Sequence, residues 1–174
     1  MGQYHLIVNL DKRQYIEPHA LGNGAKLMEF GRSADGALTA LTLLLACSNG
    51  RGLGDFYLPK STLQGEEKAA LAERYSEIVG SWAGDRIAIV GDYAKDIDLP
   101  TGASPFPASH IYELCVAGGD LRERWASWTV QLADMAGDRD SWRLTIEPHD
   151  LFTDVSSYLA VLLEAGEGIK ITAW

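Results

Sequence analysis

"YHLIVNLDKRQYI", residues 4–16, is the stretch that decides the predicted fold. Its residues alternate imperfectly between apolar and polar on either side of Asp11–Lys12, and many are β-branched or aromatic, which is typical of strands. We therefore expect an antiparallel hairpin with a tight turn at Asp11–Lys12. Pro18 should end the second strand, because proline has no backbone N–H to donate to a sheet.

The rest of the chain mixes helical and extended patterns. The apolar run at 36–48 predicts a helix that Asp35 caps and Asn49–Gly50 ends, and that is central because it is apolar on almost every side. The segment 110–116 is ambiguous between strand and helix. Further helices are expected at 65–80, at 121–137 after an Asp120 cap, and at 155–166 after an Asp154 cap. Strands are expected at 55–58, 85–93, 141–148 and 168–174.

This order predicts an α+β fold. We expect a single compact domain over residues 1–174, with a mixed, largely antiparallel sheet and about four flanking helices. The opening hairpin favours this class over the alternative, a doubly wound parallel α/β sheet.

Charge and apolar patterning exclude several classes of protein. The net charge is −9 and no run of Lys or Arg offers a basic face, so direct nucleic-acid binding is not expected. No apolar stretch is long enough to cross a membrane and no signal-peptide pattern opens the chain, so a cytoplasmic protein is expected. Cys47 and Cys115 lie in apolar runs and are expected to be buried free thiols. The acidic balance suits solubility or a protein partner with a basic surface.

The glycine-rich stretch "SNGRGLGDFYLP", residues 48–59, invites comparison with phosphate-binding loops. It lacks the Gly-Lys-Ser/Thr of a P-loop, and the glycines follow a predicted helix instead of preceding one. No helix N-terminus would therefore face an anion. The stretch predicts a turn.

Aspartates at predicted strand ends are candidate ligands for a divalent metal. Asp55, Asp85 and Asp92 flank predicted strands, and Asp96 and Asp98 follow shortly after. Hard cations prefer carboxylate oxygens, but the segment lacks the glycine and distal glutamate of an EF-hand. The alternative is that these are solvated loop carboxylates that stabilise turns.

A second metal hypothesis rests on a repeated tetrapeptide. Ile-Glu-Pro-His occurs at 16–19 and at 146–149. If the two strand ends lie side by side, Glu17, His19, Glu147 and His149 provide two imidazoles and two carboxylates for one ion. The alternative is that each proline ends a strand and each histidine caps or packs locally.

No catalytic residue can be assigned from motifs. The chain has no GxSxG elbow and no arrangement of a nucleophile with a base. Trp125 and Trp128 are spaced i, i+3 on the helix expected at 121–137, where they form either an interface anchor or part of the core.

Three segments carry a resemblance to a known group of proteins. "MGQYHLIVNLDKRQYIEPH", "LGNGAKLMEFG" and "GSWAGDRIAIVGDY" resemble a family of uncharacterised small proteins from bacteria, particularly actinobacteria, and from their phages and mobile elements. The resemblance covers roughly the first 95 residues. That family has no established activity, cofactor or site, so no residue role is transferred. The resemblance implies a cytoplasmic accessory or inhibitory protein that binds host machinery.

Two functions from different classes therefore remain. The first is a non-catalytic binding protein that applies an acidic surface and exposed loops at 48–59 and 94–108 to a basic partner. Its candidate interface residues are Asp96, Asp98, Trp125 and Trp128. The second is a small metal-dependent enzyme or ligand-binding domain built on Asp55, Asp85 and Asp92. The oligomeric state is not predicted.

Overall fold

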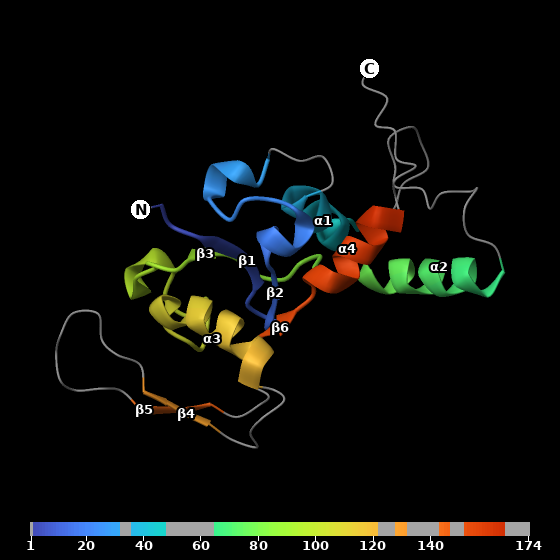
Figure 1. Ribbon diagram of the computed structural model, residues 1–174. Helices are drawn as coiled ribbons and strands as arrows, with labels where there is room; N and C mark the ends of the chain where they lie inside the picture. Colours follow the sequence, from blue (N-terminus) through green and yellow to red (C-terminus); the bar gives the residue numbers. More distant parts are fainter. Residues whose placement is uncertain are drawn as a thin grey trace. The chain divides into compact units, whose positions relative to one another are not determined.

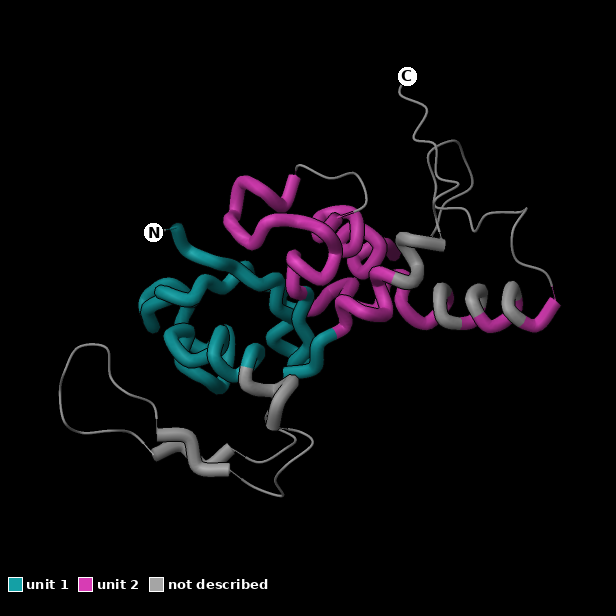
Figure 2. The backbone as a smooth tube through the Cα atoms, in the orientation of Figure 1, with its two compact units in different colours: residues 1–16, 86–154 teal, residues 17–85, 155–174 magenta. Residues whose placement is uncertain are grey.

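The computed structural model describes residues 2–31, 36–47, 65–121, 128–131, 143–146 and 152–165. The chain divides into two compact units, each built from two separate stretches of sequence (Figure 2). Unit 1 comprises residues 1–16 and 86–154, and unit 2 comprises residues 17–85 and 155–174. The expectation of one domain over residues 1–174 stays a prediction.

Unit 1 contains a four-stranded mixed sheet (Figure 1). Its strands, in spatial order, are β3 (Ile87–Gly91), β1 (His5–Asn9), β2 (Gln14–Ile16) and β6 (Thr153–Asp154). β1 is antiparallel to both neighbours, whereas β2 and β6 are parallel. With four α-helices among the described residues, the predicted α+β class with a largely antiparallel sheet is confirmed.

The predicted hairpin is confirmed, but its turn is longer than expected. The connection runs from Leu10 to Arg13. The buried Asn9 organises this turn, because its Oδ1 accepts hydrogen bonds from the N–H groups of Asp11 (3.0 Å) and Lys12 (2.8 Å). Arg13 adopts a positive φ of 53°, which is uncommon for a residue with a side chain.

One face of the sheet carries the core of unit 1. Leu6, Val8 and Leu10 point to the same face because strand side chains alternate. Helix α3 (Ala108–Leu121) covers them with residues spaced i, i+3 and i+4. The buried cluster comprises Leu6, Val8, Leu10, Tyr15, Val90, Ile111, Leu114, Cys115 and Phe152. Each such apolar side chain contributes about 1.5–3 kcal/mol when it is fully buried.

Helix α3 and strand β4 correct the prediction for residues 110–137. The ambiguous segment 110–116 is helical, and the helix continues through Gly118, Gly119 and Asp120. Asp120 therefore does not cap a following helix. Residues 128–131 form strand β4 (Trp128–Gln131), which pairs antiparallel with β5 (Arg143–Ile146). The strand expected at 141–148 is thus present as β5.

Unit 2 is helical in the part of the chain that the structure describes. It contains two 3₁₀ helices, η1 (Pro18–Leu21) and η2 (Leu27–Glu29), and the α-helices α1 (Ala37–Leu45), α2 (Glu66–Ile78) and α4 (Ser156–Ala165). Pro18 opens η1, where the missing N–H of proline costs nothing. Gly22 ends η1 with a φ of 73°, a conformation that favours glycine.

Helix α1 begins one residue later than predicted. Its N-cap is Gly36, so the predicted Asp35 cap is wrong; Asp35 itself lies outside the described residues. The Oδ1 of the buried Asn23 accepts the N–H of Ala37 at 2.5 Å. A side chain from an earlier loop therefore caps the helix. Leu38 is 41% exposed, so α1 is not buried on every side as predicted.

The end of α1 is also set by distant residues. The helix ends at Leu45, before the predicted Asn49–Gly50 stop. The carbonyl oxygens of Leu43 and Leu44 accept N–H groups from Gly80 (2.9 Å) and Trp82 (2.8 Å). Gly80 has a φ of 73°, and a Cβ there would overlap the carbonyl oxygen of Ala46. Only glycine fits this approach of two backbones.

Helices α2 and α4 lie where the sequence predicts helices. In α2, Ala70 is exposed. Asp154 ends β6 and is not the cap of α4. The buried Ser156 begins α4, and its Oγ accepts the N–H of Glu17 at 2.7 Å. Cys115 is buried as predicted, but Cys47 is exposed.

Several expected elements lie outside the described residues. These are the glycine-rich stretch 48–59 with the strand at 55–58, and the strand at 168–174. Within the described ranges, no helix is both long and apolar enough to cross a membrane.

Candidate functional site

The segment that follows β3 places three of the predicted site aspartates in one turn. We define the acidic turn as residues 92–98, DYAKDID. It contains Asp92, Asp96 and Asp98 and includes the 3₁₀ helix η3 (Asp96–Asp98). The turn lies in unit 1, between the end of the edge strand β3 and the start of α3 (Figure 1).

Asp92 joins the start of the turn to β1. Its N–H donates to the carbonyl oxygen of Tyr4 at 3.0 Å, and its Oδ1 accepts the N–H of Tyr4 at 3.1 Å. This reciprocal pair extends the β1–β3 ladder by one residue pair beyond His5 and Gly91. The Asp92 carboxylate therefore has a structural role, whatever else it binds.

Asp98 closes the 3₁₀ helix. Its Oδ2 accepts the N–H of Lys95 at 2.8 Å, and its own N–H donates to the carbonyl oxygen of Lys95 at 2.8 Å. On either side of this helix, Ala94 and Leu99 pack against the core cluster. These hydrogen bonds and contacts anchor both ends of the 3₁₀ helix.

Asp96 joins the turn to helix α3. Its Oδ1 accepts the Oγ–H of Ser109 at 2.6 Å and the N–H of Ser109 at 3.3 Å. These hydrogen bonds favour the charged form and lower the pKa of Asp96 below its usual value of 3.8. The carboxylate also lies at a helix N-terminus, where a negative charge is favourable.

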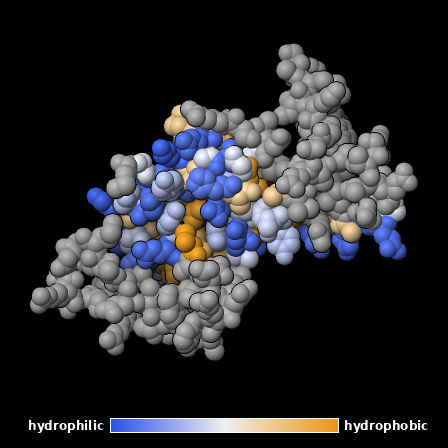
Figure 3. Space-filling view, in the orientation of Figure 1, coloured by the Kyte–Doolittle hydropathy of each residue, from blue (hydrophilic) through white to orange (hydrophobic). Residues whose placement is uncertain are grey.

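The acidic turn presents apolar side chains between its carboxylates. Ile97 is 87% exposed and Tyr93 is 50% exposed, whereas Asp96 and Asp98 are exposed on either side of Ile97. Most of the described surface in the view of Figure 3 is hydrophilic. Ile97 is therefore the unusual residue of the acidic turn, because it is a large apolar side chain that is exposed between two carboxylates.

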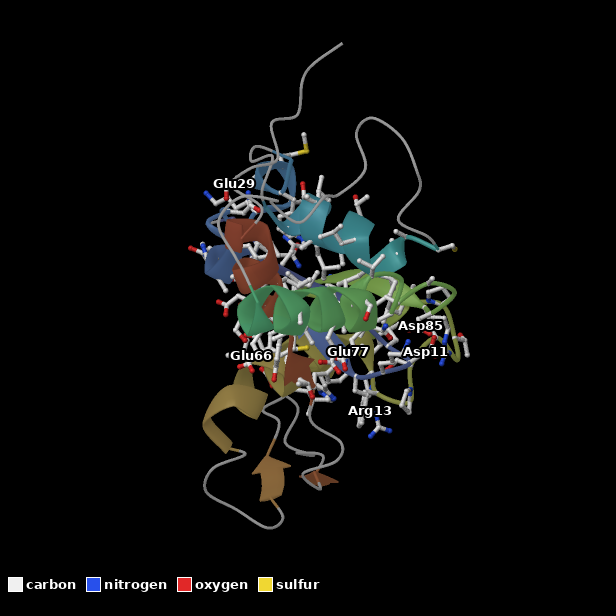
Figure 4. All side chains as sticks on the ribbon, turned by 90° about the vertical axis from the view of Figure 1, so that its right-hand side faces the viewer. Asp11, Arg13, Glu29, Glu66, Glu77 and Asp85 are labelled. Atoms are coloured by element: carbon white, nitrogen blue, oxygen red, sulfur yellow. The ribbon has the colours of Figure 1, made fainter. Side chains whose placement is uncertain are left out.

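The hairpin turn carries a second group of charges in unit 1. Arg86 donates from its backbone N–H and from Nε to the carboxylate of Asp11 (2.6 and 2.8 Å), and from Nη1 to the carbonyl oxygen of Gly102 (2.9 Å). The bonds to Arg86 lower the pKa of Asp11. Figure 4 shows Asp11 and Arg13 extending from this turn. Arg13 lies 5.5 Å from the ring centre of Phe106, a cation–π contact.

The proposed aspartate metal site is not assembled by the residues that the structure describes. Asp92 belongs to unit 1, where it follows β3, whereas Asp85 is the last residue of the first stretch of unit 2. Asp55 lies outside the described residues. Among the described side chains, no group of three or more His, Cys, Asp or Glu could hold a metal ion.

The Ile-Glu-Pro-His hypothesis stays a prediction. His19 is exposed on η1, and the backbone of Glu17 bonds to Ser156. Glu147 and His149 lie outside the described residues.

The tryptophan pair is corrected. Trp128 begins strand β4, so it does not share a helix face with Trp125, which lies outside the described residues.

The sequence analysis did not single out Ile97 and Tyr93. The available signal was an isolated apolar residue between two aspartates, "DID" at 96–98, in a segment already expected to be an exposed loop.

Comparison of the chain with protein-family models, with curated proteins and with solved structures found no match.

Proposed function

We propose that this protein is a non-catalytic binding protein that applies its acidic turn to a basic surface on a protein partner. In the setting that the sequence resemblance implies, it is a cytoplasmic accessory or inhibitory protein of phage or mobile-element origin, and the partner belongs to the host machinery. The observation that carries this proposal is the 87% exposure of Ile97 between Asp96 and Asp98.

The arrangement has the features of an interface anchor. Protein interfaces combine a central apolar side chain, which enters a pocket of the partner, with a polar rim around it. Ile97 supplies the apolar centre, and the carboxylates of Asp96 and Asp98 supply an acidic rim. The hydrogen bonds of Asp96 and Asp98 fix the turn before binding, so less conformational entropy is lost when the complex forms.

The charge of the whole chain supports the same kind of partner. A net charge of −9 attracts a basic surface at long range and raises the association rate at low salt. The exposed carboxylates of the acidic turn then fix the orientation.

The test compares two exposed side chains on two 3₁₀ helices. Ile97 on η3 is 87% exposed and Met28 on η2 is 85% exposed. Immobilised wild-type protein, Ile97→Ser and Met28→Ser are each incubated with lysate of an actinobacterial host, and bound proteins are quantified by mass spectrometry. A partner that buries Ile97 should be retained by wild type and Met28→Ser and reduced at least roughly tenfold for Ile97→Ser, since full burial of such a side chain is worth about 1.5–3 kcal/mol.

Salt provides an independent measurement on the same complex. The association rate of the complex, measured by surface plasmon resonance, should fall as ionic strength rises, because salt screens the attraction between the acidic protein and its basic partner. A partner that Ile97→Ser retains as well as Met28→Ser does would contradict the proposal, as would a purified complex whose association rate is independent of salt.

A further inference from the structure

We draw no further inference here: the strongest candidate, the exposed apolar stripe that Leu38 and Leu45 form on helix α1 of unit 2, carries none, because nothing in the described residues shows what covers it.

Discussion

The cap of helix α1 allows a prediction that a double-mutant cycle can test. Asn23 is 5% exposed and accepts the N–H of Ala37, which is fully buried. Asn23→Ala leaves that donor without its partner, and an unsatisfied buried donor costs about 1–3 kcal/mol. We expect the free energy of unfolding to fall by about 2 kcal/mol. For a chain of this length, that corresponds to a lower melting temperature by about 6 °C.

Gly36→Ala should act through the same hydrogen bond. A Cβ on Gly36 would overlap the side-chain oxygen of Asn23, so Asn23 must leave Ala37. This single substitution should also cost about 2 kcal/mol. The double variant Asn23→Ala/Gly36→Ala should cost about 2 kcal/mol and not 4, because the bond can be lost only once, which gives a coupling energy of about −2 kcal/mol.

The cycle is measured by urea unfolding followed by circular dichroism at 222 nm, with a control in the same region. Gly31→Ala places a Cβ 3.7 Å from Leu38 Cδ1, an ordinary contact, and should change stability by less than about 0.5 kcal/mol. The capping argument would be refuted if the double variant lost the sum of the two single losses in free energy of unfolding. It would also be refuted if Asn23→Ala lowered this free energy no more than Gly31→Ala does.

Three further predictions concern charged groups. Asp11→Asn should lower the melting temperature at pH 7. Arg86 lowers the pKa of Asp11 from 3.8, so the ion pair stabilises the fold fully above pH 3.8, and this stabilisation is lost as pH falls through the folded-state pKa. The melting temperatures of wild type and Asp11→Asn should therefore converge below about pH 3.8. A gap that persists at pH 2 would count against the ion pair. Ser109→Ala should destabilise α3 by about 1 kcal/mol through loss of its bond to Asp96, which urea titration measures; no change would mean that the bond is not formed in solution. Mg²⁺, Mn²⁺ or Zn²⁺ should leave the melting temperature unchanged in a thermal-shift assay, whereas a gain of several degrees that Asp92→Asn abolishes would favour the metal-dependent enzyme.

The local signals in the sequence were sufficient for the hairpin and for the strand at 87–91. Leu6, Val8 and Leu10 alternate with residues of the other face, and this period of two indicates a strand without any knowledge of its neighbours. The fold class follows from the same hairpin, because two strands joined by a short turn are antiparallel.

The ends of helices could not be predicted in this way. Helix α1 stops at Leu45 because Gly80 and Trp82 donate to its last carbonyl groups, and neither residue is near in sequence. The same holds for its start, which Asn23 caps from an earlier loop. Gly and Asn in the sequence indicate where a helix would end if only neighbouring residues mattered. In this fold, hydrogen bonds to residues distant in sequence decide where helix α1 begins and ends.

Helical spacing misled the prediction for residues 121–137. Trp125 and Trp128 fit an i, i+3 pattern, but Trp128–Gln131 pairs with Arg143–Ile146, and Trp, Thr and Val all favour strands. In the candidate site the aspartates were predicted, but their role was not. Asp92 and Asp96 accept hydrogen bonds from Tyr4 and Ser109 in other segments, and Asp98 accepts one from Lys95 within the turn. A sequence does not show which partners a carboxylate will find.

The parallel pair of β2 and β6 has a consequence for synthesis on the ribosome. Gln14 pairs with Thr153, so the first hairpin is made long before the strand that lies beside it. At 5–20 residues per second, the nascent hairpin waits on the order of ten seconds for this neighbour. During that interval β2 has an exposed edge, and closing so long a loop of chain is entropically slow. Folding of unit 1 is therefore completed only after residues 153 and 154 have been made, and a ribosome that stalls before residue 153 would leave an open sheet available to chaperones or to aggregation.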